Sequence, residues 1–302
     1  MADVSLVGGA VWDGLAESAR SAEVHTAAGL ISAEASADAE VLDVSGCTVV
    51  PGLIEAHSHL CWNAGPDWRE VYDAESDAAI AFRMAGNAHR MLQAGITTVR
   101  DLGSPTPQSV ALRDSIRAGV LQGPDLLVAG APVTPTGGHC WFLGGEADGI
   151  EGLKVAVRER RKAGVDWIKV MASGGNMTPG SNVYAPQFSV EELQAVVAEA
   201  HRLQIRVAAH AHGVEGIKAA VEAHVDMLEH CSFQTPEGSV KDDAVIAEIA
   251  RQGIIVSPTI TGRLGTFRGQ PRWTLRGELT RALFAAGCRV LMSTDCGIPN
   301  TP

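Results

Sequence analysis

The longest regular part of the chain opens with Pro51-Gly52-Leu53-Ile54-Glu55-Ala56-His57-Ser58-His59, residues 51–59. In this stretch a Pro-Gly break precedes a short apolar run, and the run ends in two histidines separated by one residue. Because residues i and i+2 of a strand point to the same face, both imidazoles can reach one metal ion. The stretch therefore predicts a buried strand that carries metal ligands at its carboxyl end.

From residue 51 onward one pattern repeats, in which an apolar strand ends in a polar cluster and an amphipathic helix leads to the next strand. We expect strands at residues 52–57, 96–101, 126–131, 167–172, 206–210, 227–230, 254–257 and 290–295. Helical patterns lie between them at residues 78–93, 152–163, 190–203, 214–223, 243–252 and 275–286. This alternation indicates an α/β fold with a parallel sheet. Eight such strands predict a (β/α)8 TIM barrel, with a doubly wound sheet as the alternative because periodicity does not fix closure.

The ends of the predicted helices carry local signals. A glycine stop follows four of them, at Gly95, Gly164, Gly253 and Gly287, and a fifth stop of the same kind, Ala118-Gly119, indicates a further helix that ends there. Glycine suits the left-handed position that stops a helix, and His224 occupies the equivalent place after the helix at 214–223. Ser189 and Glu192 have the spacing of a capping box at the start of the helix at 190–203.

Residues 1–50 differ from the rest of the chain. Short β-type runs are separated by Gly, Ala and Asp, and no helical pattern appears. We expect a small N-terminal β-layer, part of a β-sandwich, followed by a barrel domain at residues 51–302. The Ala- and Ser-rich stretch at residues 18–39 receives no assignment.

Composition excludes several classes of function. The chain has 302 residues and a formal net charge of -11, which argues against binding to nucleic acid or to an anionic membrane surface. No apolar run approaches the roughly 20 residues that span a bilayer, and the N-terminus has no signal-peptide pattern. Six scattered cysteines without a CxxC pair indicate reduced thiols and a cytoplasmic protein. We expect a small-molecule substrate, and a homo-oligomer is left open.

Polar side chains gather at the predicted strand ends, where parallel α/β folds place their active sites. Six of the ten histidines fall at or just beyond these ends: His57, His59, His139, His210, His212 and His230. Any one of them alone is as readily a satisfied core or loop residue. As a set that shares one edge with Lys169 and Asp295, they indicate a metal centre at the carboxyl ends of the strands.

Lys169 lies inside the apolar run Trp167-Ile168-Lys169-Val170-Met171, where an unpaired cation is costly to bury. Its amine either extends to a loop, pairs with a carboxylate, or is neutralised by a lowered pKa or by reaction with carbon dioxide. The resulting carbamate would be an anionic ligand able to bridge two cations. Asp295 ends the last predicted strand, where a carboxylate can bind a metal and accept a proton, with a turn or N-cap role as the alternative.

A glycine-rich loop at residues 174–184 follows the lysine strand. The pair Gly174-Gly175 allows the backbone to approach the site closely, and Tyr184 is a candidate substrate contact. An ordinary long loop is the alternative interpretation.

Five motifs, in order along the chain, resemble those of the amidohydrolase superfamily. They lie at residues 51–59, 168–169, 209–213, 228–230 and 293–295. The chain is most similar to the imidazolonepropionase-like and Xaa-Pro (Xaa-Arg/Lys) dipeptidase branch, from about residue 40 to residue 298.

This resemblance implies a binuclear centre with two divalent metal ions, most often zinc. His57 and His59 would hold one ion together with Asp295, and His210 and His230 would hold the other. A carbamylated Lys169 would bridge the two ions. The resemblance further implies that His139, in the segment Thr136-Gly137-Gly138-His139, contacts the scissile carbonyl oxygen, and that His212 lies on the substrate side.

The implied chemistry is hydrolysis of a carbon–nitrogen bond. Two cations lower the pKa of a bridging water toward about 7, and Asp295 carries its proton to the leaving nitrogen. His139 stabilises the oxyanion. We expect cleavage of an amide bond in a dipeptide or N-acyl amino acid, while the same centre also suits cyclic amides, carbamates and esters. A thiol mechanism is not expected, because no ordering group accompanies Cys140, Cys231 or Cys296.

Members of this superfamily continue well past the aspartate of the last strand, through a final barrel helix and strands that complete the N-terminal layer. Here Pro302 stands seven residues after Asp295. We therefore expect the chain to lack the last barrel helix and to be marginal, oligomeric or insoluble, because an uncovered apolar flank favours association. An inactive remnant that binds metal without turnover is the corresponding alternative.

Overall fold

The computed structural model describes residues 2–302, without the side chains of Arg263, Leu264 and Arg272. The chain forms two compact units, Met1–Leu53 and Ile54–Pro302.

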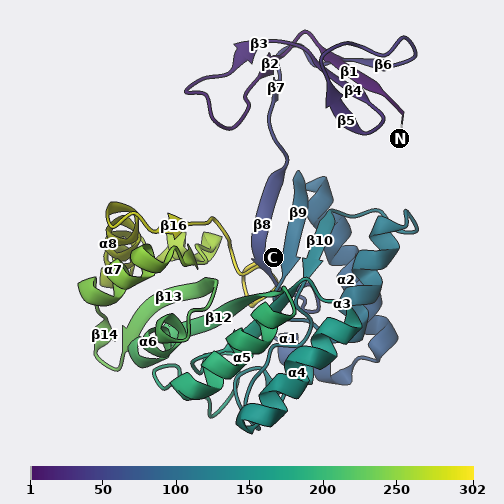
Figure 1. The fold of residues 1–302 in the computed structure, drawn as a ribbon. Coiled ribbons are helices and arrows are strands. Elements are labelled where there is room, and N and C mark those ends of the chain that lie inside the picture. The colour runs from purple at the N-terminus through teal and green to yellow at the C-terminus, as the bar shows by residue number, and fades with distance from the viewer. Residues whose placement is uncertain (1) are drawn as a thin grey trace. The chain divides into compact units, whose positions relative to one another are not determined.

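The first unit is built from two small β-sheets (Figure 1). Its described residues form the strands β1 (Val4–Val7), β2 (Ala10–Val11), β3 (Arg20–Ser21), β4 (Val24–Ala27), β5 (Leu30–Ser32), β6 (Glu40–Asp43) and β7 (Thr48–Val49). These strands pair in the orders β5-β4-β1-β6 and β3-β2-β7. Residues 2–53 contain no helix, and the stretch 18–39, which had no sequence assignment, holds β3, β4 and β5.

The second unit contains two sheets whose strands follow the order of the chain. Its strands are β8 (Leu53–Ser58), β9 (Ile96–Asp101), β10 (Asp125–Val128), β11 (Trp167–Met171), β12 (Arg206–Gly213), β13 (Met227–Thr235), β14 (Gly238–Ser239), β15 (Ile255–Ser257) and β16 (Arg289–Val290). One sheet has the order β10-β9-β8 and the other β11-β12-β13-β15-β16, with β14 paired antiparallel to the end of β13. The pairs β9–β10, β11–β12, β12–β13, β13–β15 and β15–β16 are parallel.

Two isolated parallel bridges connect the sheets. Val133, after β10, pairs with Val170 of β11, and Ser58 of β8 pairs with Cys296, after β16. The strand order runs in one direction through both sheets, whereas the order of a doubly wound sheet reverses at a switch point. The arrangement therefore argues against the doubly wound alternative.

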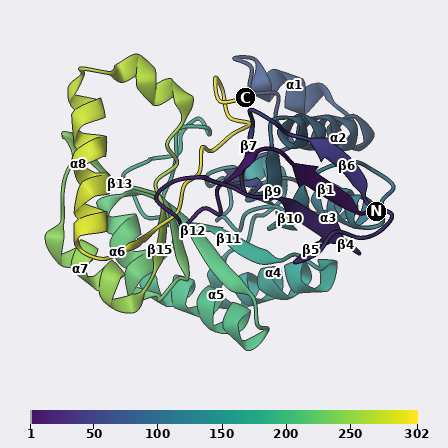
Figure 2. The ribbon, with the colours of Figure 1, turned by 90° about the horizontal axis from the view of Figure 1, so that it is seen from above.

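Helices cover the outer side of these strands (Figure 2). They are α1 (Trp68–Ala74), α2 (Asp77–Gln93), α3 (Thr106–Arg117), α4 (Gly149–Ala163), α5 (Val190–Arg202), α6 (Val214–Glu222), α7 (Asp243–Gln252) and α8 (Pro271–Ala285), with short 3-10 turns η1 (Trp141–Leu143) and η2 (Gly262–Phe267). From α2 to α8, each helix contacts the next one in the chain. Within residues 2–302, no helix combines the length and apolarity needed to cross a membrane.

The predicted helix ends are confirmed. Ser189 and Glu192 form both hydrogen bonds of the capping box at the start of α5. Gly164 and Gly253 cap α4 and α7 in the left-handed conformation, with φ of 87° and 70°. His224 also adopts positive φ, 59°, after α6, as its position in the sequence predicted.

The predicted eighth strand is wrong in its extent. The sequence placed it at residues 290–295, but β16 covers only Arg289–Val290. Its neighbour β15 ends at Ser257, before Pro258 and a left-handed Thr259, so the later residues lose their ladder partner. Asp295 itself has a φ of 63°, outside the extended region that strand residues usually adopt. The glycine stop at Gly119 follows α3, whose bounds, Thr106–Arg117, had no sequence assignment, and the helix at Trp68–Ala74 was not predicted.

The main core of the second unit lies between the strands and their helices. Buried strand residues in this core include Ile168, Val170, Val207, Ala209, Leu228 and Val256. They pack with helix residues such as Leu153, Leu193, Val196, Ile217, Ile246 and Ile249. Because successive strand residues point to opposite faces, the intervening positions, among them Lys169, His210 and Glu229, are free to face the interior side of the sheets.

Candidate metal centre and active site

A cavity of about 910 Å³ lies at the carboxyl ends of the strands. Every site residue predicted from the sequence lines it: His57, His59, His139, Lys169, Tyr184, His210, His212, His230 and Asp295. The fold thus brings residues, some of which are more than two hundred positions apart in the sequence, into the lining of one cavity. Tyr184, which is 38% exposed, is the only one of these nine that is not buried or nearly so.

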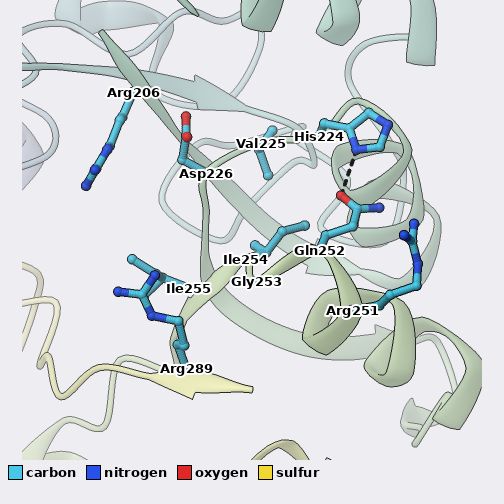
Figure 3. Close-up of a pocket in the computed structure, with 10 residues that line it drawn as sticks. All are labelled: Arg206, His224, Val225, Asp226, Arg251, Gln252, Gly253, Ile254, Ile255 and Arg289. Atoms are coloured by element: carbon cyan, nitrogen blue, oxygen red, sulfur yellow. Dashed lines mark hydrogen bonds between the residues drawn. The ribbon is translucent and has the colours of Figure 1, made fainter. Parts of the chain in front are cut away.

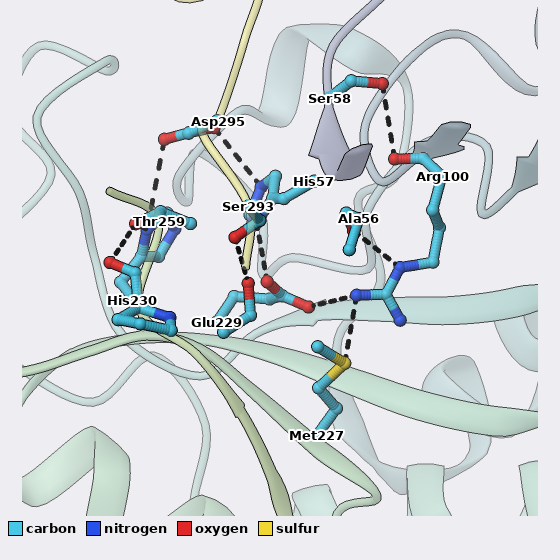
Figure 4. Close-up of polar contacts among 12 residues, drawn as sticks. Ala56, His57, Ser58, Arg100, Met227, Glu229, His230, Thr259, Ser293 and Asp295 are labelled. Carbon is cyan, nitrogen blue, oxygen red and sulfur yellow. Dashed lines mark hydrogen bonds and ion pairs between the residues drawn. The ribbon is translucent and has the colours of Figure 1, made fainter. Parts of the chain in front are cut away.

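His57 of β8 and His59, just after β8, converge on one carboxylate oxygen. Asp295 Oδ1 lies 3.3 Å from His57 Nε2 and 3.2 Å from His59 Nε2. His57, His230 and Asp295 also form a group whose ligand atoms lie within 4.8 Å of one another (Figure 4). We call His57, His59 and Asp295 the first half of the centre.

A second group consists of three histidines from neighbouring strands. The ligand atoms of His210, His212 and His230 lie within 4.8 Å of one another. The ring of His212 stacks on that of His230 at 4.3 Å between centroids. The geometry therefore admits His212 as a ligand as well as on the substrate side, where the sequence placed it. We call His210 and His230 the second half of the centre.

Hydrogen bonds determine which ring nitrogen of His59 and of His210 has a lone pair free to bind a metal ion. His59 Nδ1 lies 3.0 Å from the carbonyl oxygen of Gly103, an acceptor, so Nδ1 carries the proton and Nε2 offers a lone pair. His210 has the opposite arrangement, because its Nε2 lies 3.1 Å from the carbonyl oxygen of Gly174. His210 therefore presents Nδ1 as its basic nitrogen.

Burial keeps the imidazoles of His57 and His210 neutral. It lowers the pKa of His57 to about 4 and the pKa of His210 well below its usual value, and the positive charge of Lys169 acts in the same direction. Asp295 and Glu229 oppose this shift at His57. Neutral imidazole is the form that binds metals, so these side chains need not lose a proton to become ligands at neutral pH.

Lys169 is almost completely buried on β11. Its side chain is 1% exposed, and its Nζ has no hydrogen-bond partner among the described residues. Burial lowers its pKa to about 8, although the carboxylates of Glu229 and Asp295 act in the opposite direction. The side chain thus neither extends to a solvated loop nor forms an ion pair with any described carboxylate.

Asp295 is ionised despite its burial. Burial raises its pKa, but at acid pH the positive charge on the neighbouring imidazoles of His57 and His59 and on Lys169 outweighs that effect and holds the pKa at about 2. Its Oδ1 has no hydrogen bond of good geometry within the described chain, although two imidazole nitrogens lie close to it. A carboxylate oxygen and two basic nitrogens that face one another without a shared proton are an arrangement that suits a cation.

The end of β13 has an unusual backbone. His230, Cys231 and Phe233 have φ values of 66°, 42° and 47°, in the left-handed region that non-glycine residues seldom adopt. His230 Nδ1 lies 2.9 Å from Thr259 Oγ1, and Thr259 is itself left-handed with a φ of 51°. This conformation turns the His230 side chain toward the cavity instead of continuing the strand alternation.

His139 reaches the cavity from the loop before η1. A side-chain carbon at Gly175 would lie only 2.4 Å from His139 Nε2, which confirms that the glycine pair allows a close approach. Thr178 Oγ1 accepts the Cys140 backbone N–H at 2.8 Å and lies 3.1 Å from His139 Nδ1, so its hydroxyl proton can be donated to that nitrogen. The His139 proton then resides on Nε2, and burial, which lowers the pKa of His139 to about 4, keeps the ring neutral.

The thiols near the site are not activated. All six cysteines are free. Burial raises the pKa of both Cys140 and Cys231 to about 12 and also raises the pKa of Cys296. These residues stay protonated at neutral pH, which agrees with the expectation that no thiol serves as the nucleophile.

Three buried charged residues beneath the cavity were missed as functional candidates. Arg100 on β9 and Glu229 on β13 form an ion pair of 2.9 Å, and Glu55 on β8 accepts hydrogen bonds from the backbone of His57 and from Thr294. Glu229 also contacts His57 Nδ1 at 2.7 Å. The signal that singled out Lys169, a charged residue within an apolar strand, applies equally to Glu55, Arg100 and Glu229.

A second cavity, of about 410 Å³, lies at the opposite, amino ends of the strands (Figure 3). Arg206, Arg251 and Arg289 line it together with His224 and Asp226. None of the site residues predicted from the sequence lines this cavity. The candidate site is therefore confined to the carboxyl ends, as expected for parallel α/β folds.

The family relationship agrees with this geometry. Residues 48–297 match the model of the amidohydrolase family, and the chain therefore belongs to the amidohydrolase family. Members of this family generally use divalent metal ions, and the two groups of His and Asp ligand atoms described above are suitable sites for them.

Individual relatives are similar over different parts of the chain. An ochratoxinase of Aspergillus niger is 33% identical over 217 residues, which are 63% of this chain and 44% of that protein. A crystal structure of a Xaa-Pro dipeptidase with bound methionine matches with a TM-score of 0.84 and 26% identity, over 99% of this chain and 81% of that one. A prolidase complexed with N-methylphosphonate-L-proline matches with a TM-score of 0.80 and 27% identity, over 97% and 78% of the two chains. The match thus spans less than half the length of the ochratoxinase.

Proposed function

We propose that this protein is a binuclear metal-dependent hydrolase that cleaves an amide bond in a small substrate such as a dipeptide or an N-acyl amino acid. The observation that carries this proposal is the convergence of Asp295 Oδ1 with the Nε2 atoms of His57 and His59, in the cavity that the buried Lys169 also lines. Neither Asp295 Oδ1 nor Lys169 Nζ has a hydrogen-bond partner among the described residues. A pair of divalent cations fits these groups.

His57, His59 and Asp295 would hold one zinc ion, and His210 and His230 would hold the other. Lys169, as its carbamate, would be the ligand that joins the two. The pKa of about 8 at Lys169 supports the carbamate, because only the neutral amine reacts with carbon dioxide. We further propose that the bridges at Val133–Val170 and Ser58–Cys296 close the two sheets into one eight-stranded barrel around the site.

The residues around the ions have distinct roles in this proposal. Bound divalent ions supply a Lewis acid that polarises the scissile carbonyl and lowers the pKa of water. Asp295, which is ionised at neutral pH, would accept the proton of the attacking water and pass it to the leaving nitrogen. His139 donates a hydrogen bond from Nε2 to the carbonyl oxygen, where negative charge develops.

The dimensions and lining of the cavity support a small, partly apolar substrate. Besides the polar ligands, Met171, Met177, Leu279 and Ile298 line its walls, and Tyr184 lies at its more exposed part. The relatives whose names specify amide substrates, the dipeptidase and the prolidase, favour the same class. The cytoplasmic location remains a proposal, as does assembly into a homo-oligomer.

The test is a metal analysis combined with a substrate screen of the full chain. The zinc-loaded protein is expected to contain about two ions per chain and to hydrolyse members of a library of dipeptides and N-acyl amino acids. His57→Asn should lose both metal and turnover, whereas His89→Ala, on α2, should keep both. A parent protein that binds no metal, or that binds it and hydrolyses no amide in the library, would contradict the proposal.

A further inference from the structure

We propose that Glu229 is a positioning residue of the metal centre, which fixes the tautomer and orientation of His57 while Arg100 serves as its counter-ion. The inference rests on the proposed metal-binding role of His57. Glu229 has no exposed surface, lies on β13 directly before His230, and contacts both His57 and Arg100 (Figure 4).

The hydrogen bonds of Glu229 leave one assignment of protons. Arg100 Nη2 donates to Glu229 Oε1 at 2.9 Å, and a guanidinium can only donate. The other oxygen, Oε2, lies 2.7 Å from His57 Nδ1. With Glu229 ionised beside Arg100, His57 Nδ1 must be the donor. The lone pair of His57 is then on Nε2, the nitrogen that faces Asp295 Oδ1 at 3.3 Å.

Arg100 is held in place by several contacts. Its Nε donates to the carbonyl oxygen of Ala56 at 2.8 Å, and its guanidinium lies 4.6 Å from the ring centroid of Trp167. Ala56 directly precedes His57, so the contacts form a closed path from His57 through Glu229 and Arg100 back to the backbone beside His57. Such a path restrains both the ring and the strand that carries it.

The partner of His57 differs from those of the other ligands. His59 contacts the carbonyl oxygen of Gly103, and His230 contacts the hydroxyl of Thr259. Among the five imidazoles whose Nδ1 partners are described at the site, only His57 contacts a carboxylate through Nδ1 at hydrogen-bond distance. An anionic partner raises the basicity of a ligating imidazole, so Glu229 should strengthen binding of the first ion.

Glu229→Gln tests this role without changing the size of the side chain. Glutamine offers one acceptor to two donors, so one orientation places its NH₂ group against Arg100 and the other places it against His57 Nδ1. The second orientation would shift the His57 proton to Nε2 and block the metal. We expect the zinc affinity of the full chain, measured by competition with a chelator, to fall about 10- to 100-fold at one of the two sites.

A matched control separates positioning from a general loss of stability. Glu199 on α5 is also buried, at 6% exposure, and pairs with Arg158 and Arg202. Glu199→Gln should shift thermal unfolding but leave both zinc affinities within about twofold of the parent. An equal loss of affinity in Glu199→Gln would show that the Glu229 effect is merely structural and would overturn the proposal.

A double-mutant cycle tests whether Glu229 acts through His57. In a His57→Asn background, Glu229→Gln should cause no further loss at that site, because the residue it positions is gone. Should Glu229→Gln fold poorly, the combined change Glu229→Met with Arg100→Met removes the ion pair and keeps the site apolar, and its zinc affinity should fall equally.

Unchanged zinc affinity in a folded Glu229 variant, with a parent that binds two ions, would overturn the positioning role alone. A parent that binds no zinc would instead refute the proposed function on which this role rests.

Discussion

The two halves of the proposed centre use the same kind of ligand but support it differently. In the first half, His57 contacts the buried carboxylate of Glu229. In the second half, His230 contacts a hydroxyl and His210 contacts a backbone carbonyl oxygen. A hydrogen bond to a charged group is stronger than one between neutral groups. We infer that the first half holds its ion more tightly, so that a chelator removes the ion of the second half first.

The largest expected effect follows from removing the group that joins the two halves. Lys169→Met takes away the proposed bridge, and turnover should fall by more than about 10³-fold as metal content drops below two ions per chain. The measurement is metal analysis beside steady-state kinetics, with His89→Ala as the control that keeps both. Metal content equal to that of the parent would contradict the bridging role.

Asp295→Asn should separate metal binding from proton transfer in the first half. An amide can still offer an oxygen to a cation but cannot carry a proton, so much of the metal should remain while kcat falls by about 10³-fold. Kinetics of the fully metallated variant provide the check. A kcat close to that of the parent would remove Asp295 from the proton-transfer role.

His139→Ala should affect neither half as a ligand site. Loss of one hydrogen-bond donor to the developing oxyanion is expected to lower kcat/KM by about 10²- to 10³-fold with metal content unchanged. If metal is lost together with activity, His139 belongs to the ligand set and its assigned position opposite the substrate is wrong.

Thr259→Val tests the support of the second half directly. The substitution removes the hydroxyl that contacts His230 Nδ1 but keeps a β-branched side chain of similar volume. Because a neutral hydrogen bond contributes only about 0.5–1.5 kcal/mol, zinc affinity should fall by about tenfold or less. The zinc affinity of both variants is measured by competition with a chelator. A larger loss of zinc affinity in Thr259→Val than in Glu229→Gln would show that the second half, and not the first, depends more on its supporting hydrogen bond.

A smaller, condition-dependent effect is expected from pH. Burial lowers the pKa of Lys169 to about 8 in the folded chain, from 10.5 for a free lysine, so the neutral amine becomes available as pH rises through about 8. Reconstitution of the metal-free protein with zinc should therefore improve between pH 7 and 9 and with added bicarbonate. His57 and His210, whose pKa values lie lower, should contribute little in this range. Equal pH and bicarbonate dependence in Lys169→Met would argue against the carbamate.

Much of the fold of the second unit could be predicted because its signals are local. Apolar runs, glycine stops and the Ser189 capping box each act within a few residues, and the structure places strands or helices close to the expected bounds. The last strand was mispredicted because its extent depends on a partner: β15 ends before Pro258, which the apolar run at residues 290–295 does not reveal.

The site could be predicted as a set of residue types at strand ends but not as a network. His57 and Asp295 are apparent from their positions, whereas the contact between His57 and Glu229 joins residues 172 positions apart. Only the fold brings them together. The same holds for His212, whose nitrogen could be placed near His210 and His230 only once the strands were aligned side by side.

The left-handed end of β13 has a consequence for how this protein can evolve. A non-glycine residue in this conformation costs about 1–2 kcal/mol, so His230, Cys231 and Phe233 together consume a sizeable part of a typical 5–15 kcal/mol stability margin. Glycine at residue 231 or 233 would relax the backbone, but both side chains are fully buried and would leave a void. At this strand end, selection for a durable fold and selection for a working active site favour different residues.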